Sequence, residues 1–235
     1  MSFLVDTTYR TNQEEIMDDF SLTGKTLDNT LNTLAIINKW LGGNQVTFSG
    51  IKKMLKNQPK YKVITIIDLG CGGGDMLRLI ADYGRNNDYS FKLIGIDANE
   101  YTVAYAKKCS KAYPEIVFLT QDIFSKEFET LVYDLAIATL FLHHFKNDQI
   151  LGLLRTLIKK ASIGVLINDL HRHKLAYYLF KLITLPVKNR MIKEDGLVSI
   201  LRGFKRQELY EISETLKVKS TIKWRWAFRF QWILN

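Results

Sequence analysis

The sequence predicts an α/β fold with a doubly wound, mainly parallel sheet of seven strands and an antiparallel closing strand. Three observations lead to this prediction. From residue 62 onwards, short Val- and Ile-rich runs alternate with helical patterns, the first run ends in a glycine-rich turn, and two more runs close the chain. Short strands separated by helices form parallel sheets that are covered on both faces. With 235 residues, of which 47% are hydrophobic, the chain can build one such domain with additions.

The first sixty residues show no sheet pattern, and we expect them (1–60) to form a helical lid over one end of the sheet. Apolar side chains recur there at steps of three and four residues, on one helix face: Leu27, Leu31, Leu34, Ile37 and Leu41. Gly42 and Gly43 should end this helix. The expected helices cover residues 12–20, 26–41 and 49–57.

The central part of the chain, residues 61–170, carries the alternating strands and helices. The strands are expected at 63–68, 91–96, 116–119, 132–138 and 162–168. The helices between them are expected at 75–84, 100–112 and 148–160. Their crossovers should be right-handed, and ligands in such sheets bind outside the carboxyl ends of the strands.

Residues 171–203 interrupt this alternation, and we expect an inserted helical cap. They hold an apolar helical patch that Pro186 closes: Leu175, Tyr177, Tyr178, Leu179, Phe180, Leu182, Ile183 and Leu185. A second short helix should follow Asp195 and Gly196.

Residues 204–235 close the domain. A helix is expected at 205–215, followed by an antiparallel strand pair at 217–224 and 227–234. The whole chain, residues 1–235, therefore reads as a single domain.

The glycine-rich turn Gly70–Gly74 follows the first expected strand and indicates a nucleoside-bearing ligand. Glycines let the backbone approach a ligand, and the next helix points its first N–H groups at it. A dinucleotide site needs Gly-x-Gly-x-x-Gly and an acid about 20 residues later. Here Asp75 stands in the third glycine place, where it would repel a pyrophosphate, and Asp97 lies 27 residues after Gly70. A cofactor with a ribose and an ammonium group but no phosphate, such as S-adenosylmethionine, fits better.

Four segments of the central part follow one another in a characteristic order. They are Asp68-x-Gly70-x-Gly72-x-Gly74-Asp75, then Asp97, then Gln121-Asp122, and last the run 134–145 that ends in His143-His144-Phe145. Together they resemble the motifs of class I S-adenosylmethionine-dependent methyltransferases. The resemblance implies a Rossmann-like fold, S-adenosyl-L-methionine as cofactor and S-adenosyl-L-homocysteine as product. A glycine-rich turn of another α/β protein would explain the turn but not the other three segments.

The resemblance also implies the contacts of the cofactor's sugar and amino-acid tail. Asp97 would accept hydrogen bonds from the ribose hydroxyls. Alternatively, it would cap the helix that begins after Ala98. Ala98 itself is expected to contact the cofactor. The backbone of Gly70 and Gly72 would meet the methionine part and the sugar. Cys71 between them is expected to be a small filler and not a nucleophile.

Further contacts are implied for the adenine and the sulfonium. Asp122 would accept the adenine amino group, or would be a plain turn acid, and Ile123 would lie against the ring. Asp68 would organise the glycine turn. The backbone of Thr139 and Leu140, after the fourth strand, would face the sulfonium end.

Histidines after the fourth and fifth strands are the candidate catalytic groups. His143 or His144 could be a general base, or both could be turn residues. His171, with Asp169, could contact an acceptor hydroxyl. We expect no metal site from these residues and His173, because side chains two positions apart at a helix start point away from each other. No Asn-Pro-Pro-Tyr motif follows the fourth strand, which disfavours nucleobase or amide nitrogen as the methyl acceptor in this resemblance.

Two outer patterns resemble a bacterial subgroup of small-molecule methyltransferases, often encoded beside polyketide-type, pigment or quinone pathways. They are Arg10-x4-Glu15-Ile-Met-Asp18-Asp19 with Ile37-Asn38-Lys39-Trp40, and Asp195-Gly196-x2-Ser199-x2-Arg202-x-Phe204. Arg10 would reach the cofactor carboxylate from the lid, or would be a surface arginine. Because the cap is apolar and rich in Tyr and Phe, we expect O-methylation of a small hydrophobic or aromatic hydroxyl compound.

The charge of the chain is unevenly spread and leaves other partners open. The net charge is +9, and residues 151–235 hold 17 Lys and Arg against 6 Asp and Glu. A basic half fits an RNA or acidic protein substrate, an anionic membrane, or plain solvated surface, and nucleic acid is the less expected of these. Lys174, Lys181 and Lys188 flank the apolar helix, which could be a pocket lid or an interfacial membrane helix. A non-catalytic cofactor-binding module is the remaining alternative.

The same survey bears on location. No run of 18 apolar residues occurs, and the start lacks the basic and apolar regions of a signal peptide. The two cysteines, Cys71 and Cys109, do not make a disulfide framework. We therefore expect a cytoplasmic protein with reduced thiols and no transmembrane segment.

Overall fold

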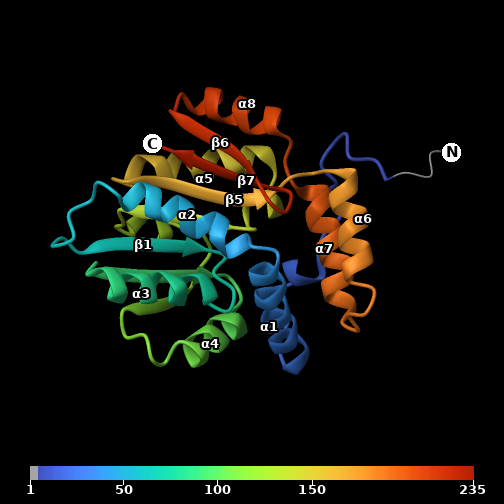
Figure 1. Ribbon diagram of the computed structural model, residues 1–235, viewed down its shortest axis with the longest axis horizontal. Coiled ribbons are helices and arrows are strands. Elements are labelled where there is room, and N and C mark those ends of the chain that lie inside the picture. Colours follow the sequence, from blue (N-terminus) through green and yellow to red (C-terminus); the bar gives the residue numbers. More distant parts are fainter. Residues whose placement is uncertain (1–4) are drawn as a thin grey trace.

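The computed structural model describes residues 5–235. Residues 1–4, which begin the expected lid and belong to the segment without signal-peptide features, lie outside the described residues. One sheet of seven strands runs through the molecule in the order β3-β2-β1-β4-β5-β7-β6 (Figure 1). The strands are β1 (Ile64–Leu69), β2 (Phe91–Asp97), β3 (Ile116–Thr120), β4 (Leu135–Thr139), β5 (Gly164–Leu170), β6 (Ser220–Arg225) and β7 (Arg229–Leu234).

The strand directions confirm the predicted fold class. β1 to β5 pair in parallel, while β7 is antiparallel to both of its neighbours, β5 and β6. β1, β4 and β5 are buried along almost their whole length, as expected for strands covered on both faces. Each of the seven strands lies where the sequence predicts one, with ends that differ by up to three residues.

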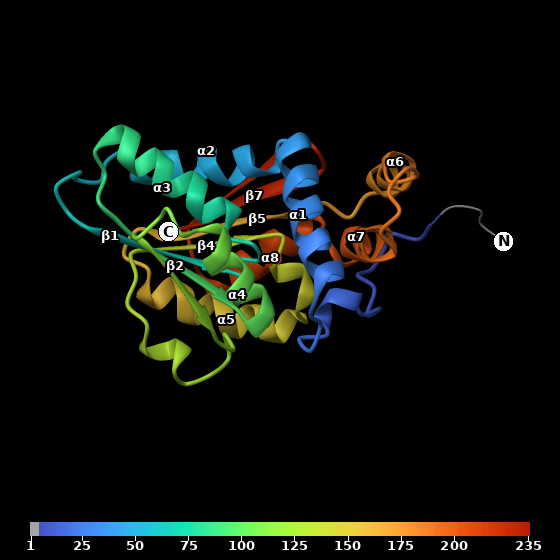
Figure 2. The same ribbon diagram turned by 90° about the horizontal axis from the view of Figure 1, so that it is seen from below.

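Eight α-helices cover the sheet and its carboxyl edge within the described residues. They are α1 (Lys25–Trp40), α2 (Gly43–Leu55), α3 (Asp75–Asn87), α4 (Glu100–Cys109), α5 (Asn147–Lys160), α6 (Lys174–Ile183), α7 (Arg190–Arg202) and α8 (Arg206–Leu216). Side chains of α2, α3 and α4 share one hydrophobic cluster with one face of the sheet, and α5 and α8 share another with the opposite face. Figure 2 shows α2 and α3 on one side of the sheet and α5 on the other.

The expected helix at 12–20 is wrong. Only a single 3₁₀ turn forms there, η1 (Ile16–Asp18). Its backbone N–H groups donate to a cap residue far away in sequence: Ile16 N to Asp195 Oδ1 at 2.7 Å and Met17 N to Asp195 Oδ2 at 3.0 Å. Because these tertiary hydrogen bonds satisfy the N–H groups, the segment does not need the ladder of a longer helix.

The second cap helix also begins earlier than expected. α7 starts at Arg190 with Asn189 as its N-cap, and its Asn189 side chain accepts from Met191 N at 3.0 Å. Gly196 lies inside this helix rather than before it. A glycine is needed there because any Cβ would overlap the ring of Phe180 on α6. The glycine therefore serves close packing of α6 on α7, and it does not break the helix.

The lid and the cap lie together at the carboxyl edge of the sheet. In Figure 1, α1, α6 and α7 stand beyond the arrowheads of β1 and β5, and the N-terminal segment lies beside α7. Contacts between η1 and α7 tie the two covers to each other. Within residues 5–235, no helix has the length and hydropathy that a membrane span requires.

Candidate active site

A cavity of about 1110 Å³ opens where β1, β2 and β4 end and the lid and cap begin. The expected cofactor contacts other than Arg10 all line it: Asp68, Gly70, Cys71, Gly72, Asp97, Ala98, Asp122, Ile123, Thr139 and Leu140. The three candidate catalytic histidines, His143, His144 and His171, line it too. The parallel sheet thus brings together, at one edge, residues that lie more than 100 positions apart in the sequence, from Asp68 to His171.

Asp97, at the end of β2, lines the cavity and does not cap the following helix. Its Oδ2 accepts from Gly72 N at 3.1 Å, and its Oδ1 accepts from Asn99 N at 3.0 Å. The capping role falls to Asn99, whose side chain accepts from Thr102 N at 2.9 Å. Burial raises the pKa of Asp97, and the hydrogen bonds from Asn99 and Gly72 and the charge of His144 oppose this only in part.

The glycine turn is shaped by two requirements. Gly70 and Gly72 have φ of 64° and 49°, a region that favours glycine. A Cβ at Gly70 would overlap the ring of Phe141, whereas a Cβ at Gly72 would meet only open space near Leu31. Gly70 therefore allows Phe141 to pack on the turn, and Gly72 leaves its backbone open to the cavity. Between them, burial raises the pKa of the Cys71 thiol, which keeps it neutral and unreactive.

The floor of the cavity holds three carboxyl groups, Asp68, Asp75 and Asp97, that have no ion-pair partner among the described residues. Asp68 is buried at the end of β1, and burial together with the charges of Asp75 and Asp97 raises its pKa well above the ordinary value. Such a floor favours a ligand that carries positive charge.

The remaining cofactor candidates have unequal freedom. The Thr139 hydroxyl is hydrogen-bonded to Thr47 Oγ1 at 2.8 Å. Leu140 holds a φ of 54° and donates its N–H to Asn168 O at 2.8 Å. Asp122 accepts from Phe124 N at 2.9 Å through one oxygen and is otherwise exposed at the rim, beside the buried Ile123.

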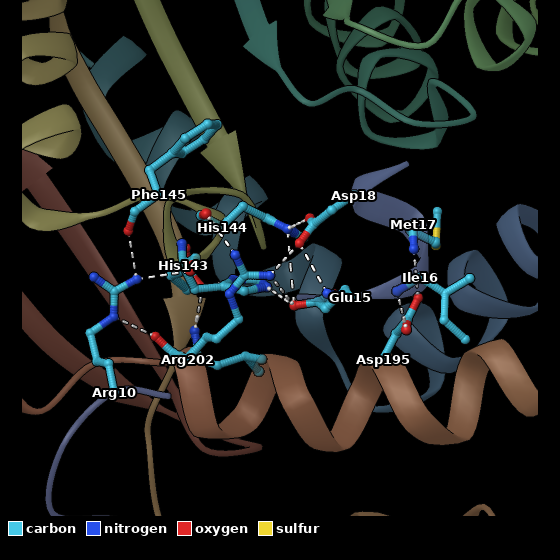
Figure 3. Close-up of polar contacts among 12 residues, drawn as sticks. Arg10, Glu15, Ile16, Met17, Asp18, His143, His144, Phe145, Asp195 and Arg202 are labelled. Atoms are coloured by element: carbon cyan, nitrogen blue, oxygen red, sulfur yellow. Dashed lines mark hydrogen bonds and ion pairs between the residues drawn. The ribbon is translucent and has the colours of Figure 1, made fainter. Parts of the chain in front are cut away.

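Arg10 does not reach the cavity, so the expected contact with a cofactor carboxylate is not supported. Its guanidinium instead donates to Arg202 O at 2.7 Å, His143 O at 2.8 Å and Phe145 O at 2.9 Å (Figure 3). It also donates to Asn147 Oδ1 at 2.9 Å. Arg10 therefore ties the lid to the turn after β4 and to the end of α7.

His143 is a buried link between the sheet and the lid. Its Nδ1 lies 2.7 Å from Asp169 Oδ1 on β5, and its Nε2 lies 3.5 Å from Glu15 Oε1 in the lid. Burial alone would lower the pKa of His143, but the charges of Asp169 and Glu15 outweigh it and raise the pKa to about 9. The ring is therefore a cation at neutral pH, held between two carboxylates.

His144 has a different environment, with one free nitrogen. Its Nδ1 lies 2.6 Å from Asp18 Oδ1, and Arg202 Nη1 donates to the other oxygen of Asp18 at 2.6 Å. Arg202 Nη2 donates to the backbone oxygen of His144 at 2.8 Å. Figure 3 shows these residues converging from η1, the turn after β4 and α7. Among the described residues, nothing bonds to His144 Nε2.

Glu15, His143 and His144 place ligand atoms within 4.8 Å of one another, close enough to hold a metal ion. However, Arg202 Nη1 lies 3.5 Å from Glu15 Oε1, the oxygen that would bind the metal, and Asp18 Oδ1 lies 2.6 Å from His144 Nδ1. The charge of Glu15 is therefore already balanced by Arg202, and the charge of Asp18 is balanced by its contacts with His144 and Arg202. The rings of His171 and His173 lie 5.2 Å apart, so they do not point away from each other as expected, while Asp169 is hydrogen-bonded to His143 Nδ1 at 2.7 Å.

His171 lies among aromatic rings on the far wall of the cavity. Its Nδ1 accepts from Trp224 Nε1 at 3.3 Å, which leaves the proton on Nε2. Burial and the neighbouring His173 lower the pKa of His171 to about 4, so the ring is neutral at pH 7. His171 can therefore donate a hydrogen bond to a ligand but is a weak base.

Glu15, Asp18 and Arg202 belong to the two outer sequence patterns, which by themselves predict no role for them. The structure brings them together from positions up to 187 residues apart. An acidic pair in a lid and an arginine in a cap carry no local signal of contact, because their side chains meet only through the tertiary fold. The apolar wall of the cavity comes from the lid, the cap and the turn between β6 and β7. It contains Met17, Leu27, Leu31, Ala176, Leu179, Phe180, Ile183, Ile200, Trp226 and Phe228.

Solved structures of several methyltransferases share this fold. The plantazolicin methyltransferase BpumL in complex with SAH is 18% identical, with a TM-score of 0.63 over 89% of this chain and 88% of that one. The magnesium protoporphyrin IX methyltransferase ChlM from Synechocystis PCC 6803 with bound SAH is 17% identical, with a TM-score of 0.55 over 83% of each chain. The CurJ carbon methyltransferase is 13% identical, with a TM-score of 0.61 over 81% of this chain and 53% of that one. No curated protein sequence matches the chain.

A family match goes beyond the fold. The family described as "Methyltransferase domain" matches residues 60–212, more than half of the chain. The matched span begins just before β1 and ends within α8, so it contains the glycine turn, Asp97, the two histidines after β4 and the cap. The chain therefore belongs to this methyltransferase-domain family.

Proposed function

We propose that this methyltransferase transfers the methyl group of S-adenosylmethionine to a hydroxyl oxygen of a small hydrophobic or aromatic compound. The observation that carries the proposal is a single cavity with two unlike walls. One wall is the carboxylate floor at β1 and β2, and the other is the apolar cover from α1, α6 and α7.

The charge of the floor supports this cofactor. S-adenosylmethionine brings a sulfonium and an ammonium group, which compensate the buried carboxylates of Asp68 and Asp97. The ribose hydroxyls can donate to the Asp97 lone pairs that Gly72 and Asn99 leave free. Hydrogen bonds to a charged acceptor contribute roughly 1.5–3 kcal/mol each. A cofactor with a pyrophosphate would meet repulsion at the same place.

The chemical step is an in-line displacement. The acceptor oxygen attacks the methyl carbon, the carbon–sulfur bond breaks, and its electron pair stays on sulfur, which becomes neutral. The hydroxyl proton must leave the oxygen. A phenol with a pKa of about 10 is roughly one part in a thousand ionised at pH 7, a deficit of about 4 kcal/mol that a base can offset.

His144 is the best-placed proton acceptor of the three candidate histidines. Asp18 fixes its Nδ1, as an orienting carboxylate does in other histidine bases, and its Nε2 is free on the cavity side. His143 is buried, is hydrogen-bonded to Asp169 through Nδ1 and has Glu15 at ion-pair distance from Nε2, so we assign it a positioning role. His171 is assigned as a hydrogen-bond donor to the acceptor.

Calorimetry and a labelled-methyl assay test the proposal. The purified protein should bind S-adenosylhomocysteine, and it should move the labelled methyl of S-adenosylmethionine to compounds in a panel of phenols and hydrophobic alcohols. His144→Gln should lower kcat by about a hundredfold or more and leave S-adenosylhomocysteine affinity unchanged. Transfer to nitrogen or carbon acceptors alone, or strongly salt-dependent transfer to RNA, would contradict O-methylation. Binding without any transfer would favour the non-catalytic alternative.

A second observation concerns how a hydrophobic acceptor arrives. α6 lies at the outer edge of the molecule (Figure 1), and its solvent face carries a stripe of exposed apolar side chains at helical spacing: Leu175, Leu179, Leu182 and Ile183. Leu179 and Ile183 also line the cavity. Lys174, Lys181 and Lys188 flank the stripe. We propose that α6 lies in the surface of an anionic membrane and receives the acceptor there.

Sedimentation with vesicles tests the membrane proposal. The protein should bind vesicles rich in phosphatidylserine and bind phosphatidylcholine vesicles less, and Leu182→Glu should abolish binding. Ile36→Glu, an exposed apolar site of similar exposure on α1, is the matched control. Equal binding by both variants would contradict the role of α6, as would dimer formation through α6 in light scattering.

A further inference from the structure

Arg229 is a buried cation without a partner in the wall of the cavity. It begins β7 and is 3% exposed. Its Nε and Nη1 make no hydrogen bond to any residue of the described chain, and no carboxylate there lies within ion-pair distance. Burial lowers the pKa of Arg229 to about 10, and the charge of Asp169 partly opposes this, so the side chain is still charged at pH 7.

A second buried arginine shows what a structural role looks like in this protein. Arg172 is fully buried, yet its guanidinium donates to both Glu208 oxygens, at 2.6 and 3.1 Å, and to the backbone oxygens of Thr7, Thr8 and Gly203. Leaving a charge buried without such partners costs free energy. Arg229 has the burial of Arg172 and none of its partners, which indicates that its partner is a ligand.

The surroundings of Arg229 favour an anion. Arg229 packs against Gly43, the first residue of α2, and a Cβ at Gly43 would lie 2.8 Å from the Arg229 Cζ. The first N–H groups of a helix lack intrahelical partners and carry partial positive charge. The buried side-chain oxygen of Asn38, beside the same glycine, is an acceptor without a partner among the described residues. Donors for an anion and an acceptor for an ammonium therefore lie side by side.

The first turn of α2, beside Arg229, is also linked by hydrogen bonds to the backbone after β4, where the sulfonium of the cofactor is expected. Asn168 Nδ2 donates to Gly43 O at 2.9 Å, and Asn168 O accepts from Leu140 N at 2.8 Å. On the other side, Asn44 of the same helix turn donates to Asp75 Oδ2 at 3.1 Å, next to the glycine turn. The first turn of α2 thus joins Arg229 to both the glycine turn and the tip of β4.

We propose that Arg229, with the first turn of α2, binds a carboxylate inside this cavity. The proposal rests on the proposed function only in naming the two molecules that can bring this carboxylate. One source is the amino-acid tail of the cofactor, whose ammonium would then meet Asn38. The other source is a carboxylate on the methyl acceptor.

Calorimetry with two probes separates these sources. S-adenosylhomocysteine carries the amino-acid tail, and 5′-methylthioadenosine has the same nucleoside and thioether without it. If the cofactor is the source, Arg229→Gln should weaken S-adenosylhomocysteine binding by about ten- to a hundredfold and leave methylthioadenosine binding unchanged. If the acceptor is the source, both should bind the variant normally, and only the preference of S-adenosylhomocysteine-loaded protein for a hydroxybenzoate over the parent phenol should be lost. Arg155→Gln, on the exposed face of α5, is the control.

Thermal unfolding without ligand gives a readout that does not depend on the cofactor. Arg229→Met should leave the melting temperature unchanged or raise it, because it removes an uncompensated buried charge, whereas Arg172→Met should lower it. A melting temperature that falls as much in Arg229→Met as in Arg172→Met would overturn the proposal. So would unchanged binding of every carboxylate probe by Arg229→Gln. If the wild-type protein binds neither nucleoside while these melting temperatures behave as stated, the proposed function fails and the carboxylate site stands.

Discussion

The link between His143, Asp169 and Glu15 should make the stability of this protein fall in mildly alkaline solution. The pKa of His143 is raised from 6.5 to about 9 in the folded state. A raised histidine pKa adds stability that is complete below the unfolded value and is lost as pH rises through the folded value. The window for this loss is therefore from about pH 6.5 to pH 9.

The size of the loss follows from the same difference. At 1.36 kcal/mol for each pH unit, the gap between the two pKa values corresponds to about 3 kcal/mol of unfolding free energy. Part of this interaction is shared with Asp169 and Glu15, whose own pKa values are lowered, but those groups lose their contribution on the acidic side. Between about pH 6.5 and pH 9, the change in unfolding free energy therefore comes from the titration of His143.

Urea denaturation at pH 6, 7, 8 and 9.5 measures this effect. The wild-type protein should lose about 3 kcal/mol more unfolding free energy across this range than His143→Gln does. His171→Gln is the matched control, since the pKa of His171 is lowered to about 4 and its contribution is constant above pH 7. A fall of equal size in wild type and His143→Gln would refute the assignment of a charged His143 between two buried carboxylates.

Four further outcomes follow from the site. Asp97→Asn should weaken S-adenosylhomocysteine binding by about ten- to a hundredfold in calorimetry, with the melting temperature little changed, because the charge-assisted bonds to the ribose are lost. Affinity for S-adenosylmethionine should fall as pH is lowered through the raised pKa values of Asp68 and Asp97, with proton release on binding; affinity independent of pH from 4.5 to 8 would contradict this. Gly70→Ala should unfold at lower temperature by several degrees, since φ is 64° and the new Cβ overlaps Phe141, and a normal melting temperature would speak against that packing. Arg10→Ala should lower stability and leave cofactor affinity within about threefold, whereas a large loss of affinity would restore a cofactor contact for this residue.

The alternation of apolar runs and helical patterns was enough to predict the sheet. Ile66, Ile67 and Leu69 are buried in β1 because a parallel strand is covered on both faces, and this leaves a continuous apolar run that can be read directly. The glycine turn and Asp97 could be placed at one edge for the same reason, since every parallel strand ends there. These predictions use only local patterns and a general rule of topology.

The expected helix at 12–20 shows where local patterns end. Its sequence is compatible with a helix, but Asp195, nearly 180 residues later, bonds the N–H groups of Ile16 and Met17 and holds a single turn. For Arg10 a cofactor contact or a plain surface position was expected, and its side chain instead donates to backbone oxygens of the turn after β4. Long-range partners decide both outcomes, and a single sequence does not contain them.

By itself the sequence determined the positions of the strands along the chain, the glycine turn and the acid at the end of β2, because spacing and hydrophobicity act between neighbours along the chain. Only the tertiary structure decided which charges are compensated. It placed Asp18 against His144 and Arg202 and supplied Arg172 with five oxygen partners. It left Arg229 buried beside the cavity, with no partner for Nε or Nη1 among residues 5–235. The physical reason is that the free energy of a buried charge depends on every group around it, and in this fold those groups come from opposite ends of the chain.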